Sequence, residues 1–172
     1  MLLSSDDGAS VELRVVGYQY PATKTGGWDG NWLVIAGVVR AVSGAPWLFV
    51  DPCLTTWEAR DLARWLREAA ADRPTGARRL VRWLREAVAD RLTGTSGAAD
   101  RLVFVEPNVG FSVAARGRDT LTLRVHLAAE AAPPSPDGRR QAASDLDLSL
   151  TAADLQAAAV AWEENLADFP ER

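Results

Sequence analysis

The sequence of 172 residues has little of the chemistry on which disulfide and metal sites depend. It contains one cysteine, Cys53, and one histidine, His126. A single thiol excludes an internal disulfide, and this pair cannot supply the four ligands of a structural zinc site. We therefore expect no metal and no cofactor, and a lone thiol is typical of a reducing compartment.

Long apolar runs and a positive net charge are also absent. No apolar run is long enough to predict a membrane-spanning helix. The first ten residues have neither the basic start nor the apolar stretch of a signal peptide, so a cytoplasmic location is the default expectation. The formal net charge is -4, which argues against a general nucleic-acid binder.

The remaining composition suits a folded globular chain. Hydrophobic residues make up 48% of the sequence and charged residues 24%, which is enough apolar material for one sizeable core. We therefore expect a single domain over residues 1–172. Within it we expect a flexible N-terminus at 1–10 and a mobile, proline-rich loop at 131–144.

Two blocks of predicted strands flank a central helical region. Alternating or β-branched segments predict strands at 11–20, 31–42, 47–51, 101–106, 110–115, 120–130 and 145–150. Capping-box patterns at Thr55/Glu58 and Thr151/Asp154 predict the starts of two helices. We expect an α+β fold: an antiparallel curved sheet of about six to seven strands, packed by one or two central helices and a C-terminal helix.

The central helical region contains a near-identical repeat. Residues 62–76 (LARWLREAAADRPTG) and 80–94 (LVRWLREAVADRLTG) differ at three of fifteen positions. Pro74 favours a break between two helices or a sharp kink in one. We favour a tandem duplication of one helix. The alternative is a nucleic-acid-binding module, because residues 57–94 carry nine arginines and six acidic residues.

An enzyme is a further alternative, and two groupings could support one. Cys53 and His126 could form a nucleophile and base, with the thiol just before a predicted helix. Carboxylates near strand ends could converge for acid–base work, and these are Asp29, Asp51, Glu58 and Glu106. We favour packing for Cys53 and capping or turn roles for the carboxylates.

Aromatic and acidic residues suggest a surface for a basic protein partner. Trp28 lies in a glycine-rich loop, where it is either an exposed anchor or folded back onto the sheet. Residues 145–172 carry seven acidic residues and one basic residue. An acidic surface can capture a basic partner. The predicted partner-binding residues are Trp28, Asp29, Asp145, Asp147, Glu163 and Glu164.

Three short motifs follow one another along the chain. They are GYQYP with WDGNWLV at 17–21 and 28–34, DPCLTTWE at 51–58, and EPNVGF at 106–111. Together they resemble the WapI-type immunity protein family, a set of small bacterial proteins, over most of the chain. The resemblance implies a non-catalytic cytoplasmic protein that protects its producer by binding a cognate polymorphic toxin. The duplicated helix departs from the family pattern. The motifs also have a structural reading, since Pro, Asp, Asn and Gly set turns at strand ends.

Overall fold

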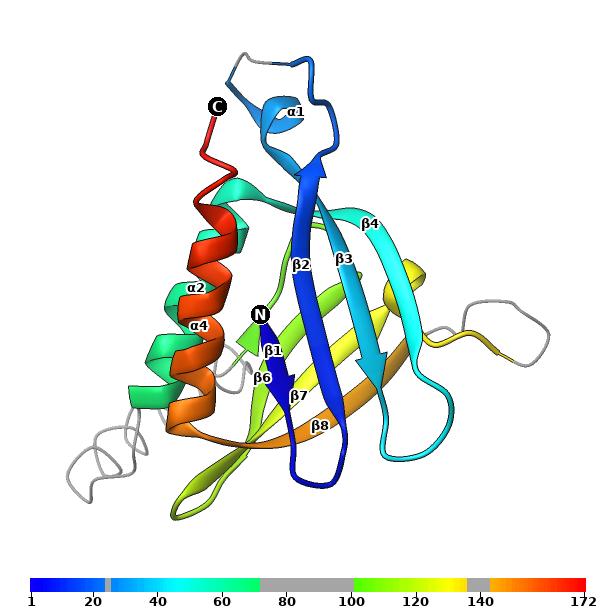
Figure 1. Ribbon diagram of the computed structural model, residues 1–172, viewed down its shortest axis with the longest axis vertical. Coiled ribbons are helices and arrows are strands. Elements are labelled where there is room, and N and C mark those ends of the chain that lie inside the picture. Colours follow the sequence, from blue (N-terminus) through cyan, green and yellow to red (C-terminus); the bar gives the residue numbers. More distant parts are fainter. Residues whose placement is uncertain (24–25, 72–100, 136–142) are drawn as a thin grey trace, which may run out of the picture.

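A computed structural model describes residues 1–23, 26–71, 101–135 and 143–172, and its strands form two antiparallel sheets (Figure 1). The first sheet has the order β1-β2-β3-β4. Its strands are β1 (Leu2–Ser4), β2 (Ser10–Tyr18), β3 (Trp32–Arg40) and β4 (Trp47–Thr55). The strands predicted at 11–20, 31–42 and 47–51 are therefore confirmed, and they form an antiparallel meander.

The second sheet has the order β5-β6-β7-β8. Its strands are β5 (Arg101–Leu102), β6 (Val109–Arg116), β7 (Thr120–Ala128) and β8 (Ala143–Thr151). A 3₁₀ turn, η2 (Ala129–Ala131), follows β7 and lies beside β4. Alternate residues of β7 are buried, as expected for a sheet with one face in the core.

Three helices complete the described part of the chain: α1 (Trp28–Asn31), α2 (Thr56–Ala71) and α4 (Ala152–Leu166). The helices α2 and α4 lie side by side along one edge of the two sheets (Figure 1). Trp162 of α4 is fully buried and donates its indole N–H to the carbonyl oxygen of Ala59 at 2.7 Å. None of the described helices is long and apolar enough to cross a membrane.

Both predicted capping boxes are confirmed. The backbone N–H of Thr55 donates to the Glu58 carboxylate at 2.8 Å, and the Thr55 hydroxyl accepts from the Glu58 N–H. The same exchange between Thr151 and Asp154 starts α4. Each box satisfies backbone donors that a helix N-terminus would otherwise leave unpaired.

The fold class is confirmed as α+β with a C-terminal helix, but the single sheet of six to seven strands is wrong. The strands form two four-stranded sheets that face one another across one core (Figure 1). Periodicity shows which side of a strand is buried. It does not show whether the strands after a helix extend the first sheet or form a second one.

The N-terminus also differs from the expectation of a flexible segment at 1–10. Strand β1 pairs with β2, and the Met1 ammonium group donates to the carbonyl oxygen of Leu13 at 2.6 Å. Leu3 is buried in the core. A three-residue strand is too short to produce a periodic sequence signal, so pairing with β2 was not visible in the sequence.

Parts of two other expectations lie outside the described residues. The expected mobile loop at 131–144 includes residues 136–142, and the repeat includes residues within 72–100. Residues 62–71 of the first repeat copy form most of α2. The tandem duplication and the number of helices that it forms remain predictions.

The contact between Gly37 and Phe49 gives a test of the packing of the first sheet. A Cβ atom at Gly37 would lie 2.1 Å from the Phe49 ring. We therefore expect Gly37→Ala to lower the free energy of unfolding by about 1–3 kcal/mol through overpacking. Gly17→Ala is the control, because a Cβ there meets no atom within 4 Å. Equal urea midpoints for the two variants would contradict this packing.

Candidate functional site

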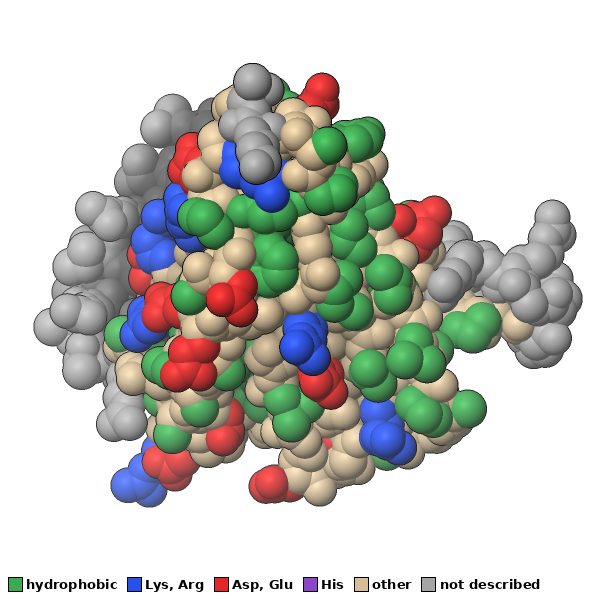
Figure 2. All heavy atoms as spheres, turned by 45° about the horizontal axis from the view of Figure 1, so that its top comes forward, with side chains coloured by type: hydrophobic (Ala, Val, Ile, Leu, Met, Phe, Trp, Pro, Cys, Tyr) green, Lys and Arg blue, Asp and Glu red, His purple; other side chains and the backbone are tan. Residues whose placement is uncertain are grey.

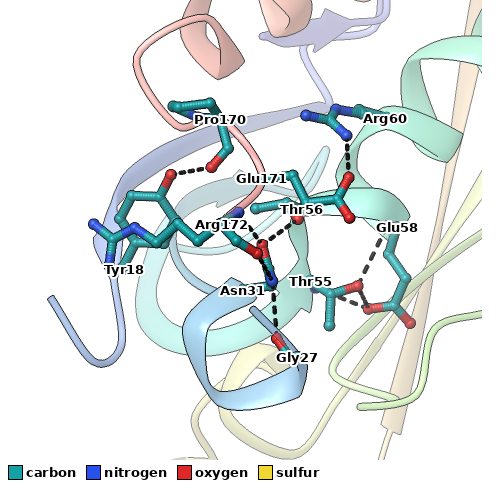
Figure 3. A network of polar contacts seen from close by, with 10 residues as sticks. All are labelled: Tyr18, Gly27, Asn31, Thr55, Thr56, Glu58, Arg60, Pro170, Glu171 and Arg172. Carbon is teal, nitrogen blue, oxygen red and sulfur yellow. Dashed lines mark hydrogen bonds and ion pairs between the residues drawn. The ribbon is translucent and has the colours of Figure 1, made fainter. Parts of the chain in front are cut away.

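The first sequence motif surrounds Asn31, which is buried at the end of α1 (Figure 3). Its amide group donates to the carbonyl oxygens of Gly27 at 2.8 Å and Arg172 at 3.1 Å. Its Oδ1 accepts from the backbone N–H of Arg172 and from the Thr56 hydroxyl. One side chain therefore joins α1, the start of α2 and the last residues of the chain.

Tyr18 holds the same C-terminal residues from the end of β2 (Figure 3). Its hydroxyl donates to the carbonyl oxygen of Pro170, and its ring meets Phe169 edge-on at 5.7 Å. The Arg172 guanidinium lies over the Tyr18 ring, 3.4 Å from the ring centroid. These contacts give the Tyr18 and Asn31 positions of the first motif a structural role.

The second and third motifs meet beside the end of β4. Asn108 is buried and donates to Asp51 at 2.7 Å and to Glu130 at 3.3 Å. Glu58, besides capping α2, accepts the backbone N–H of Val105 at 2.8 Å. The segment before β6 is therefore fixed against β4 and the first turn of α2.

This junction gathers negative charge. Burial raises the pKa of Asp51, and the nearby charges of Glu130 and Glu106 raise it further, while the hydrogen bond from Asn108 acts in the opposite sense. Among the described residues, no cation forms an ion pair with Asp51, Glu106 or Glu130. Nor does that part of the chain hold a group of three or more side chains placed to bind a metal ion.

The pairing of Cys53 with His126, considered above as an alternative, does not occur, and the favoured packing role of Cys53 agrees with its burial. Cys53 is buried in the core, where burial and the surrounding carboxylates raise the pKa of its thiol to about 12. A thiol with this pKa remains protonated at neutral pH and is a poor nucleophile. His126 instead makes hydrogen bonds with Ser112 and Asp145, both at 2.8 Å.

The chain Ser112–His126–Asp145 has the connectivity of a hydrolase triad, but its setting is that of a sheet surface. The three residues lie on the neighbouring strands β6, β7 and β8. Ser112 is paired on both sides, with Arg101 and with Arg124, so its backbone N–H belongs to the sheet ladders. A hydrolase needs free N–H donors at the position of the oxyanion. We interpret the chain as a cross-strand polar ladder.

The six residues predicted to bind a partner lie on three separate elements. Trp28 and Asp29 are in α1, Asp145 and Asp147 are on β8, and Glu163 and Glu164 are on α4. Strand β8, predicted at 145–150, lies at one edge of the second sheet.

Three of the predicted partner-binding carboxylates make polar contacts within the chain. Asp147 forms a two-pronged pair with Arg124, which lowers the pKa of that carboxyl, and Glu163 pairs with Arg67. Asp145 accepts from His126. Partner capture by these groups would first require their internal pairs to be broken.

Sequence reasoning missed an apolar surface on the first sheet. We call it the outer face and define it by the cross-strand pairs Val34–Pro52, Ala36–Val50 and Val38–Leu48. Leu48 is 68% exposed and Val50 is 64% exposed. Figure 2 shows hydrophobic side chains gathered over β3 and β4. The largely apolar run at 31–42 predicts a strand, and the structure covers only one side of that strand.

Three tryptophans continue the outer face at one end. Trp32 lies on the same side of β3 as Val34. Trp28 packs edge-on against Trp57 with ring centroids 5.1 Å apart, and lies 6.2 Å from Trp32. Trp28 nevertheless remains 53% exposed. It is thus both folded back onto its neighbours and available to a partner.

Comparison with known proteins adds one finding. The model of the Immunity protein WapI-like family matches residues 1–170, which is nearly the whole chain. No curated protein and no solved structure matches.

The raised pKa of Cys53 predicts a silent thiol. In the native protein at mildly alkaline pH we expect negligible reaction with a disulfide reagent such as DTNB, because both burial and protonation protect the sulfur. One thiol per chain should react after unfolding in urea. Rapid labelling of the native protein would contradict the burial of Cys53.

The raised pKa of Asp51 predicts a stability gain on neutralisation. A carboxyl whose folded-state pKa exceeds its unfolded value stabilises the fold when protonated, and this contribution is lost as the pH rises through the folded-state pKa. Asp51→Asn should therefore raise the free energy of unfolding at neutral pH. After screening by solvent the gain should be below about 1 kcal/mol.

The gain of Asp51→Asn should disappear in acid, below the unfolded pKa, where the native carboxyl is also protonated. Urea unfolding at both pH values checks this. Glu164→Gln on the exposed side of α4 is the control. A loss of stability at neutral pH would mean that the Asn108 contact outweighs burial and repulsion.

Proposed function

The chain belongs to the Immunity protein WapI-like family, and from this membership we propose that it binds a cognate bacterial toxin and neutralises it without catalysis. The partner is then a protein, and inhibition follows from occlusion of the toxin's working surface. Such a protein protects the cell that makes the toxin, so we place it in the cytoplasm, where the unpaired thiol of Cys53 is stable.

The outer face is the observation that supports a binding role most directly. Monomeric soluble proteins rarely expose contiguous apolar patches unless a partner covers them. The outer face combines exposed aliphatic side chains with the tryptophan cluster of Trp28, Trp32 and Trp57. Tryptophan is the residue type most enriched among side chains that dominate binding energy.

The groups that could support an enzyme favour structural roles instead. The Cys53 thiol is buried and protonated, and Ser112 lies within a paired strand. Asp51, Glu58 and Asn108 are engaged in contacts that fix the junction of the sheets. A binder needs none of these groups as reactive atoms.

The partner-binding residues suggested by the sequence divide into two groups under this proposal. Trp28 and Asp29 lie beside the tryptophan cluster and contribute to the contact. Asp145, Asp147 and Glu163 serve the chain's own ion pairs, and Glu164 on α4 lies on a different element from the outer face.

Co-expression with a toxin, if one is encoded beside this gene, tests the proposal. The wild-type protein should restore growth and co-purify with the toxin. Cys53→Ala, Ser112→Ala and His126→Ala should protect equally well, because occlusion uses no reactive side chain. Absence of both rescue and complex would exclude this toxin as the partner and defeat the proposed role.

Loss of protection with any of the three alanine variants, in a protein that still folds and still binds the toxin, would instead reveal catalysis. Circular dichroism and co-purification of each variant separate the two results.

A further inference from the structure

We infer that the outer face, together with an acidic border formed by Asp51, Glu106 and Glu130, is the surface that contacts the toxin, and that it takes a basic protein surface with an apolar centre. This inference rests on the proposed function and specifies where and by what chemistry the partner is bound.

The apolar centre is open because of the position of β4. This strand is the last of its sheet, and its side chains Leu48 and Val50 point away from the core. On β3 the side chains of Val34, Ala36 and Val38 alternate with core residues and form the adjoining row. One side of the first sheet thus packs against the core, and the other side is uncovered at β3 and β4 (Figure 2).

The acidic border lies along the edge of β4 that does not pair with β3. Asn108 contacts both Asp51 and Glu130, which places η2 and the end of β4 next to each other. Glu106 is two residues before Asn108 and close enough to raise the pKa of Asp51. Glu106 and Glu130 are exposed. The border is therefore negative and lies beside the end of β4, where Asp51 stands between Val50 and Pro52 in the strand.

The border differs from the acidic residues of the described chain that form ion pairs. It also differs from other unpaired ones such as Glu164 and Asp168, because Asn108 contacts two of its carboxylates at once. Asp147 and Glu163 face arginines of their own chain, as do Asp61 and Glu171. In contrast, no described cation is paired with Asp51, Glu106 or Glu130. These carboxylates repel one another and have no cation of their own chain beside them. Lysine or arginine side chains of a partner could therefore pair with them.

Charge also decides between the possible occupants. A second copy bound about a two-fold axis would place the same patch on itself, and the two acidic borders would face each other. Nucleic acid and anionic lipid would be repelled by the same border. On the rest of this side of the sheet, Glu12 and Arg14 of β2 offset each other. Arg40 at the end of β3 adds one positive charge, so the three carboxylates still leave the surface negative. A basic protein surface with an apolar centre is the occupant that complements both the apolar outer face and the acidic border.

The energetics of the border agree with a binding role. Ionised Asp51 is held in a partly buried position beside other carboxylates, which opposes folding at neutral pH. Residues that lower stability in the free protein are found most often at functional sites. Arginine or lysine from a partner would remove this penalty in the complex.

Affinity for the toxin of the neighbouring gene, measured by calorimetry on the full chain with a catalytically inactive toxin, tests the surface. We expect Leu48→Ser with Val50→Ser, and separately Glu106→Lys with Glu130→Lys, to weaken binding by roughly tenfold or more. Added salt should weaken wild-type binding and have less effect on the Glu106→Lys/Glu130→Lys protein.

Matched controls separate the site from general effects. Leu2→Ser with Val160→Ser removes exposed apolar side chains on β1 and α4, outside the three pairs that define the outer face, and Glu164→Lys with Asp168→Lys makes the same charge change on α4. Both controls should bind like the wild type. Thermal melts of every variant show that the fold persists, because all eight substituted side chains are exposed.

Three results would overturn the inference, and they are distinguishable. Wild-type affinity in both test variants would reject this surface while leaving the immunity role intact. A wild-type protein that neither binds nor protects would reject the immunity role and the surface together. A homodimer in sedimentation that Leu48→Ser/Val50→Ser dissociates would assign the outer face to a second copy.

Discussion

The buried carboxylate of Glu58 connects the parts of the molecule on which the candidate surface depends. One oxygen caps α2 through Thr55, and the other accepts the N–H of Val105 from the segment that leads into the second sheet. Loss of this side chain would leave buried backbone donors unsatisfied, at about 1–3 kcal/mol each. Because Val105 is fixed here, Asn108 reaches Asp51 and Glu130, and the acidic border lies along β4. The residue that caps α2, Glu58, thereby helps to fix the position of the acidic border.

Short sequence patterns were enough to predict the helix starts and several of the strands. The two capping boxes and the strands β2, β3, β4 and β8 follow from short-range patterns of polar and apolar residues. The division into two sheets could not be predicted, because the same alternation fits a strand in either sheet. Strand β1 has too few residues for any period. The link from Asn31 to Arg172 joins residues 141 positions apart, and no local pattern reports such a contact.

The candidate site was less predictable than the fold, for a related reason. Acidic residues were counted along the sequence, but their availability depends on which cations lie opposite them. Asp147 lies beside Arg124 on the neighbouring strand, whereas Asp51 and Glu130 share only the amide of Asn108. Similarly, the apolar run of β3 does not reveal which of its sides is covered, and only the arrangement of the sheets shows that one side is uncovered. Family membership supports the proposed role, and the structure distinguishes carboxylates that are ion-paired from those that are not.

The central claim is that an apolar sheet surface with an unpaired acidic border receives the toxin. Amide hydrogen exchange, compared between the free protein and its complex with the neighbouring toxin, tests this most directly. The account predicts new protection in β3, in β4 and in the segment from Val103 to Asn108, with little change in β8 and α4. Protection confined to β8 and α4, with β3 and β4 unchanged, would contradict it.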